Sequence, residues 1–402
     1  MENKNNFFYQ LLLFLFFIFL FFSHVPGLLI ETVKQERYGM DFQWSGAKLL
    51  WEGINHYQYF LNGEIEGRII FNQEGQYQDL DERIIFFQAG EYLQGLYVIL
   101  YPFAKMDWVY AKTLWAFINF ILSMIIPYLL CKKFELSKEK TLLVIFCSVI
   151  MPTTTMAMSL GQQTPFIFLF FILPFVWKSK LSYILSGISY FKYSIGYALF
   201  LFYLSQKKIK IILLSSIPAI LGWLIYCAIT DSNYLDNLME PLKVATAIGW
   251  TTTKNPIIYL LSFINSINIF GDNTLWVLIL SVIINFFFII KITRIKNELL
   301  KLSCLCISVL IFAPHNAYGY IMLLPIFIYS LKNSEEFLSK LNIVIFIYLN
   351  MSYPFILQYL SILNRHTDLE ILNNFYYYLS YFNILLLLII LIMNIRKISH
   401  KE

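Results

Sequence analysis

An acidic residue among aromatic side chains, Asp41, stands in residues 38–59, directly after the first apolar segment of the chain. The letters AKLLWEG that follow it predict a helix of about three turns at a membrane surface, ended by Gly53. A carboxylate near a helix N-terminus is stabilised by the helix dipole, and it can accept a proton as a general base. The same position also suits a carboxylate that only caps the helix.

Three further polar residues stand in or beside long apolar runs. Lys192 lies in the middle of the run 181–204, where an ionisable residue is usually functional and an ammonium can bind a phosphate. Its long side chain can also simply reach an interface. Gln162 stands in the turn GQQTP, and His315 stands in the turn APHNAYG. Both side chains can contact a ligand, and both also fit an ordinary structural role.

Patterns of several other chemistries are absent from the sequence. It has no HExxH motif, no phosphate-binding glycine-rich loop, no dinucleotide-binding fingerprint and no CxxC pair. Its five cysteines lie in or beside apolar runs without metal-binding spacing, at positions 131, 147, 227, 304 and 306. No basic patch interleaved with aromatic residues suits a nucleic acid. We therefore expect no metal, no cofactor and no nucleic-acid partner.

The composition places these residues in a membrane protein. Hydrophobic residues make up 58% of the chain and charged residues only 14%, whereas about one quarter of an average soluble protein is charged. Many apolar runs are long enough to cross a bilayer, and backbone hydrogen bonding in lipid then requires helices. We expect an all-α polytopic membrane protein, a single integral domain over residues 1–402, with about 10–12 transmembrane helices.

The order of apolar and polar segments predicts how these helices alternate. The run 7–30 fits a retained first span, and a long acidic loop, 31–92, follows it. Residues 93–104 are too short to span and fit an interfacial or re-entrant segment. Around Lys192 we expect two half-helices whose basic ends lie on one side. The other predicted spans, interrupted by a second polar loop at 231–273, are 109–131, 141–160, 166–177, 211–230, 275–290, 302–312, 320–331, 341–360 and 381–395.

Short basic segments predict the orientation of the chain. Both chain ends and the segments 132–140, 178–180, 205–210, 291–301 and 332–340 hold 19 of the 30 lysine and arginine residues. Positive charge favours the cytoplasmic side, so we expect both termini to lie in the cytoplasm and the protein to lie in the cell membrane. The loops 31–92 and 231–273 and the turns GQQTP and APHNAYG then face outward.

Several of these stretches, in this order, resemble glycosyltransferase family 87. The stretch GMDFQWSGAKLLWEGINHYQY is similar to the signature that follows the first span of that family. Its later segments are similar to LYVILYPFAKMDWVYAKTLW, SLGQQTPFIFL, SGISYFKYSIGYALF and APHNAYGYIMLLP. The sequence departs from the family at Thr164, where an asparagine is usual, and at Gly319, where an acid is common.

The resemblance implies an enzyme of the GT-C superfamily. Such an enzyme takes a hexose, typically mannose, from a polyprenyl-phosphate donor and transfers it with inversion to a glycan or glycolipid acceptor outside the membrane. In that interpretation Asp41 is the catalytic base, Lys192 and His315 stabilise the departing phosphate, and Gln162 orients hydroxyl groups. The lipid-linked sugar is a substrate, so no cofactor is implied.

Two other functional classes fit a membrane protein of this kind. A polysaccharide polymerase of the O-antigen type is also rich in aromatic residues, but its large outer loop usually comes late in the chain. A transporter or flippase for lipid-linked sugars is expected to show internal repeats and paired broken helices. Turnover of a polyprenyl-phosphate sugar by the purified protein without any gradient separates the transferase from the transporter.

Overall fold

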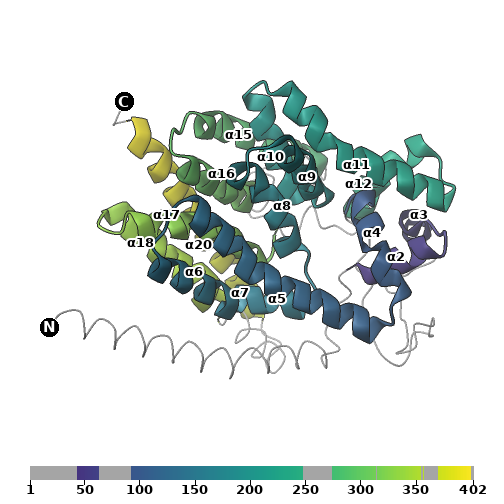
Figure 1. Ribbon diagram of the computed structural model, residues 1–402, viewed down its shortest axis with the longest axis horizontal. Helices are drawn as coiled ribbons and strands as arrows, with labels where there is room; N and C mark the ends of the chain where they lie inside the picture. The colour runs from purple at the N-terminus through teal and green to yellow at the C-terminus, as the bar shows by residue number, and fades with distance from the viewer. Residues whose placement is uncertain are drawn as a thin grey trace.

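The computed structural model describes residues 43–62, 92–247, 274–313, 315–354, 356 and 370–399. Every regular element in these ranges is a helix, which confirms the predicted all-α architecture (Figure 1). Asp41, the predicted first span 7–30, most of the acidic loop and residues 248–273 lie outside the described residues.

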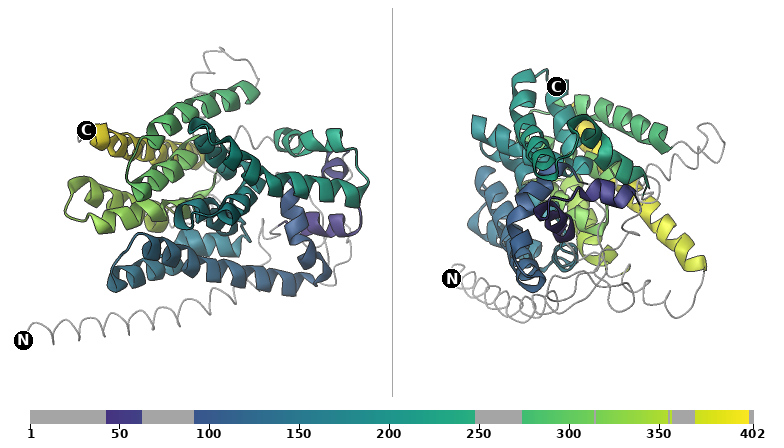
Figure 2. Two further views of the ribbon diagram at one scale, coloured as in Figure 1. Left: turned by 45° about the horizontal axis from the view of Figure 1, so that its top comes forward. Right: turned by 90° about the vertical axis from the view of Figure 1, so that its right-hand side faces the viewer.

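Two groups of helices lie at opposite ends of the molecule (Figures 1 and 2). One group is formed by α2 (Trp44–Trp51), α3 (His56–Leu61), α4 (Gln94–Leu100) and α12 (Tyr234–Ala247). The other contains α18 (Phe337–Ile347) and α20 (Glu370–Ser399). Helices α2 and α3, which belong to the signature stretch 38–59, therefore lie far from α20 near the C-terminus, and α3 packs against α12 of the second predicted loop.

Three described segments are long and apolar enough to cross a bilayer: Tyr110–Lys133 of α5 (Trp108–Lys133), α11 (Ile209–Thr230) and Leu379–Arg396 of α20. A bent pair adds a fourth if it is counted as one span. It consists of α6 (Lys138–Ile150) and α7 (Pro152–Ser159), which meet at 47°. Proline lacks a backbone donor and is tolerated in the first turn of a helix, so Pro152 begins a new helix where the sequence predicted a continuous one.

Shorter apolar helices account for much of the remaining bundle. They are α8 (Thr164–Val176), α10 (Tyr193–Ser205), Ile279–Thr293 of α15 (Thr274–Thr293), η3 (Ala317–Leu323) with α17 (Leu324–Lys332), and α18 with the π-helical turn η4 (Tyr348–Ser352). Helix α16 (Glu298–Phe312) lies among them. Every residue of α16 after Glu298 except Lys301 is buried, and this helix packs against α15, α17 and α20. A helix that is apolar on all sides belongs in the middle of a bundle.

The predicted break at Lys192 is present. Helix α9 (Lys180–Ser186) continues as the 3₁₀ turn η2 (Gly187–Phe191), and α10 starts directly after Lys192. A Cβ on Gly196 of α10 would lie 2.5 Å from the Cα of Tyr190, so α10 folds back closely on η2.

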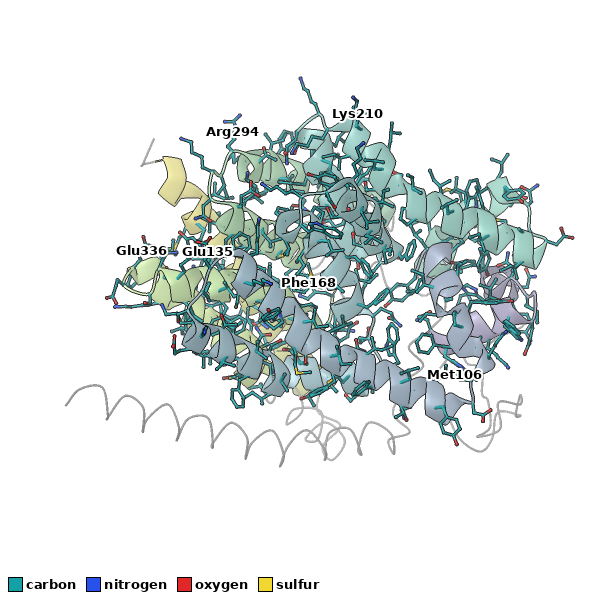
Figure 3. All side chains as sticks on the ribbon, in the orientation of Figure 1. Met106, Glu135, Phe168, Lys210, Arg294 and Glu336 are labelled. Carbon is teal, nitrogen blue, oxygen red and sulfur yellow. The ribbon has the colours of Figure 1, made fainter. Side chains whose placement is uncertain are left out.

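The two basic ends of this hairpin also lie together, as predicted. The Lys178 ammonium is 3.7 Å from the Glu298 carboxylate. Burial and then the charge of Lys301 lower the pKa of Lys208, and Glu298 raises it, which places Lys208 beside the same group. Lys210 and Arg294, from neighbouring basic segments, project from one edge of the molecule (Figure 3).

Residues 93–104 form no span, in agreement with the prediction. They contain α4 and the 3₁₀ turn η1 (Tyr101–Lys105). Helix α4 touches α11 backbone to backbone, because a Cβ on Gly222 would lie 2.3 Å from the Cα of Gly95. Small residues allow such close approach between helices in membranes.

Two further basic segments are joined directly. The Lys140 Nζ donates to the Leu331 carbonyl at 2.6 Å, and the Lys332 Nζ donates to the Phe134 carbonyl at 2.8 Å. The segments 132–140 and 332–340 therefore lie side by side, as expected of loops on one side of a membrane.

Replacing Gly222 with valine is expected to lower the free energy of unfolding by roughly 1–3 kcal/mol, because the new side chain would collide with the backbone of α4. The matched control is Ala228→Val on the exposed face of the same helix. Each variant is heated in detergent, and the temperature at which half of the monodisperse protein is lost gives its midpoint. Equal midpoints for the two variants would show that the backbone contact is not tight.

Candidate functional site

The stretch after Asp41 forms two short helices rather than the predicted helix of about three turns. Helix α2 has eight residues, and α3 begins after the N-cap Asn55. The predicted end at Gly53 is confirmed: its φ is 76°, its amide donates to the Leu50 carbonyl at 3.0 Å, and the Ile54 amide donates to the Leu49 carbonyl at 2.9 Å. This pair of bonds is a Schellman motif, in which a left-handed residue ends the helix.

Helix α2 is buried inside the protein on most of its residues. The Trp44 indole donates to the Phe103 carbonyl at 3.0 Å, and the Tyr97 hydroxyl donates to Gln43 Oε1 at 2.8 Å. Gln43 and Trp44 are both buried. Asp41 itself lies two positions before Gln43, outside the described residues.

A buried carboxylate that the sequence did not single out holds α3 against α12. Glu240, 3% exposed, accepts hydrogen bonds from Asn55 Nδ2 at 2.9 Å and from Gln58 Nε2 at 2.8 Å. The Asn237 amide donates to the same carboxylate, and Gln94 donates to the Asn237 carbonyl at 2.7 Å. A buried charge requires such donors. We call Asn55, Gln58, Gln94, Asn237 and Glu240 the Glu240 network.

A buried histidine lies beside this network. His56 is 0% exposed, and its Nδ1 shares a 2.7 Å hydrogen bond with the Tyr226 hydroxyl. Its ring centroid is 3.9 Å from that of Tyr57 and 4.0 Å from that of Tyr97. Burial lowers the pKa of His56 to about 3, so the ring is neutral at physiological pH.

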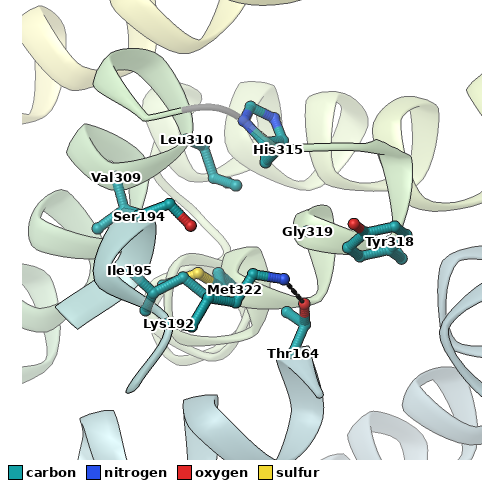
Figure 4. A pocket seen from close by; sticks show the side chains of 10 residues that line it. All are labelled: Thr164, Lys192, Ser194, Ile195, Val309, Leu310, His315, Tyr318, Gly319 and Met322. Carbon is teal, nitrogen blue, oxygen red and sulfur yellow. Dashed lines mark hydrogen bonds between the residues drawn. The ribbon is translucent and has the colours of Figure 1, made fainter. Parts of the chain in front are cut away.

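Lys192 lines a pocket at the break between η2 and α10 (Figure 4). Its ammonium donates to Thr164 Oγ1 at 2.9 Å and lies 5.5 Å and 5.2 Å from the ring centroids of Tyr92 and Tyr318. The enclosed part of the pocket is small, about 10 Å³. It is lined by Thr164, Lys192, Ser194, Ile195, Val309, Leu310, His315, Tyr318, Gly319 and Met322.

His315 lines the same pocket, as a neutral ring. Burial, and to a smaller extent the charge of Lys192, lower its pKa to about 4, although a bond to Ala313 opposes the shift. Because a carbonyl can only accept, His315 Nδ1–H donates to the Ala313 carbonyl at 3.1 Å. The other ring nitrogen, Nε2, is then an acceptor. A Cβ on Gly319 would lie 3.1 Å from the ring, so an acid at that position would require the histidine ring to shift by a few tenths of an ångström.

Gln162 does not line this pocket, and its turn is not at the surface. The side chain is 4% exposed, and Gln163 is also buried. The turn is held from α5: the Trp115 indole donates to the Gly161 carbonyl, and Asn119 Nδ2 donates to the Gln162 carbonyl, both at 3.2 Å. The prediction that Gln162 caps a turn at the surface is therefore wrong in its exposure, because α5 supplies buried partners for the backbone of the turn. The sequence signal for a buried partner was Asn119, a single amide side chain within the apolar run 109–131.

The structure thus brings together two of the four predicted site residues, Lys192 and His315, and adds Thr164 and Tyr318. Within the described ranges, no group of three or more histidine, cysteine or acidic side chains could hold a metal ion. Comparisons with protein-family models, with characterised proteins and with solved structures found no match. The pocket is therefore interpreted from its own chemistry.

Acid is expected to destabilise the protein through His56. The unfolded chain takes up a proton below pH 6.5, whereas the folded ring resists protonation until about pH 3. Above pH 6.5 His56 is neutral in the folded and the unfolded chain, and its protonation does not lower the free energy of unfolding. As the pH falls from 6.5 to 4, the free energy of unfolding decreases by roughly 3 kcal/mol. Thermal unfolding over this range measures the loss, and His56→Asn, whose side chain does not titrate, should flatten the profile. Identical profiles for the two proteins would refute the assignment.

Proposed function

We propose that this protein is a membrane-embedded glycosyltransferase that moves a hexose, mannose in the simplest case, from a polyprenyl-phosphate donor to a glycan or glycolipid acceptor on the outer face. The proposal includes a GT-C-like arrangement of about 10–12 spans, with both termini in the cytoplasm. One observation carries it: the Lys192 ammonium stands at a helix break inside an apolar bundle and faces a pocket.

The electrostatics of the pocket suit an anion. Thr164 opens α8 and Lys192 directly precedes α10, so two helix N-termini meet at the pocket. Helix N-termini and lysine ammonium groups both favour negative charge. None of the described residues that line the pocket is acidic. A phosphate is the anion that a polyprenyl-phosphate sugar would bring.

The pocket encloses about 10 Å³, room for roughly one water molecule, so a phosphate would bind there only if the side chains that line it move. A phosphate bound there would leave the polyprenyl chain in the bilayer. Half-buried Lys192 is accessible for such a contact.

The proposed transfer assigns separate tasks to these groups. The acceptor oxygen attacks C1 of the donor sugar from the side opposite the phosphate, and the bond between C1 and the phosphate oxygen breaks. The phosphate leaves with the electron pair, stabilised by Lys192, and the acceptor proton goes to the carboxylate of Asp41. Neutral His315, whose Nε2 is an acceptor, suits a sugar hydroxyl better than a phosphate oxygen.

A transporter of lipid-linked sugars is the second candidate, because discontinuous helices with a charged residue at their break are also typical of transporters. An assay of the purified protein with a polyprenyl-phosphate sugar and no gradient separates the two functions. A transferase releases polyprenyl phosphate, and a transporter leaves the donor intact.

Replacing Lys192 with alanine is expected to weaken binding of polyprenyl phosphate roughly 10- to 100-fold, because a hydrogen bond to a charged group is lost. Lys192→Arg should retain part of the affinity, since the charge is kept. Lys210→Ala, at an exposed lysine outside the pocket, is the control. Calorimetry in detergent measures the affinities, and an alanine variant with unchanged affinity would exclude Lys192 from the phosphate site.

Replacing Asp41 with asparagine is expected to reduce transfer by roughly 10²- to 10⁴-fold while lipid-phosphate binding is retained, because asparagine cannot accept the proton. Asparagine caps a helix about as well as aspartate, so a mere cap would tolerate the change. Single-turnover assays measure the rate. Near-normal turnover would remove Asp41 from the catalytic role.

A further inference from the structure

Helix α12 is amphipathic in the opposite sense to a helix of a soluble protein. The face that it turns toward the protein is partly polar: Asn237, Glu240, Pro241 and Val244 are buried. The face that it leaves uncovered is apolar, with Leu235 at 77% and Leu238 at 52% exposed, and it continues over Tyr234, Met239 and Leu242. In water, this arrangement would expose the apolar side and bury the polar one.

The two exposed charges of α12 form a third sector. Asp236 and Lys243 are exposed and lie seven residues apart, which is close to two helical turns. At 3.6 residues per turn they fall between the apolar face and the buried face. The helix therefore has an apolar face, a charged edge and a polar face that contacts the protein.

The apolar face continues the uncovered surface of α11, the span that precedes it. Only 22% of the most apolar stretch of α11 is buried inside the protein, and Leu221, Leu224 and Ile225 are exposed. The two helices meet at an aromatic pair: the rings of Trp223 and Tyr234 are 5.9 Å apart, and the Trp223 indole donates to the Tyr234 carbonyl at 3.2 Å. Tryptophan and tyrosine are enriched where the bilayer meets water.

The polar face connects this helix to the start of the chain. Through Glu240, α12 holds Asn55 and Gln58 of the α3 segment. Whatever covers the apolar face of α12 therefore also fixes the position of α3.

We infer that α12 is an interfacial helix whose apolar face is embedded in the hydrocarbon of the bilayer, with its charged edge at the head groups, and that it anchors α3 there. The beginning of the segment 231–273, which the sequence predicted as an outer loop, then lies in the interface of the bilayer. Three sectors of this kind are typical of helices that lie in a membrane interface. The continuity with the surface of α11 favours lipid over a protein partner.

Nitroxide labels on α12 test this inference in the reconstituted full-length protein. Single cysteines replace Leu235, Leu238 or Leu242, and matched controls replace Asp236 or Lys243 on the same helix. Cys147 is changed to alanine because it is partly exposed, and the other four native thiols are buried. Power saturation compares collisions with oxygen, which concentrates in lipid, and with a nickel chelate, which stays in water. The ratio of oxygen to nickel collisions should be severalfold higher at the three leucine positions than at the two controls.

Two other results would overturn the inference. Equal ratios at all five positions would place α12 in water. Low collision with both reagents at the leucine positions, relieved by dilution into more lipid, would show that a second copy of the chain covers the face. A diazirine-labelled phospholipid gives an independent measurement on the unmodified protein: cross-links should fall on 234–242 and avoid Asn237 and Glu240, and a helix free of cross-links would contradict embedding.

Discussion

A helix that stops inside an apolar bundle leaves backbone groups that lipid cannot satisfy, so the protein must bond them. After η2 this requirement is met by a third segment: the Phe191 carbonyl accepts from the Leu93 amide at 3.0 Å, and the Lys192 carbonyl accepts from the first turn of α10. Leu93 reaches this place because Gly95 and Gly222 let α4 and α11 touch through their backbones. The hairpin, α4 and α11 thus depend on one another, and the position of the Lys192 ammonium depends on all three.

Features that are local in the chain were predictable from the sequence. Gly53 ends α2 because a left-handed residue is needed there, and the break in the run 181–204 falls at its one lysine, Lys192. The number of spans was harder to predict from the sequence. Pro152 bends the predicted span 141–160, and several runs form helices too short to cross a bilayer alone. Whether such a run stops or continues depends on partners that lie elsewhere in the sequence.

The candidate site shows the same division. Lys192 and His315 could each be predicted as site residues from the sequence. That they line the same pocket follows only from the tertiary structure. Gln162 was misplaced because a polar turn between apolar runs resembles an exposed turn, and its partners are on α5. Glu240 resembles an ordinary loop acid until its donors are known, and two of them, Asn55 and Gln58, come from the other end of the sequence.

The spacing of these partners has a consequence for biosynthesis. Asn55 and Glu240 are 185 residues apart, and Lys140 and the Leu331 carbonyl are 191 apart. At 5–20 residues per second, the second partner of each pair leaves the ribosome roughly 10–40 s after the first. For that time Asn55 and Lys140 must be hydrated at the bilayer surface or shielded by the insertion machinery. The contacts that join these segments can therefore form only late in translation.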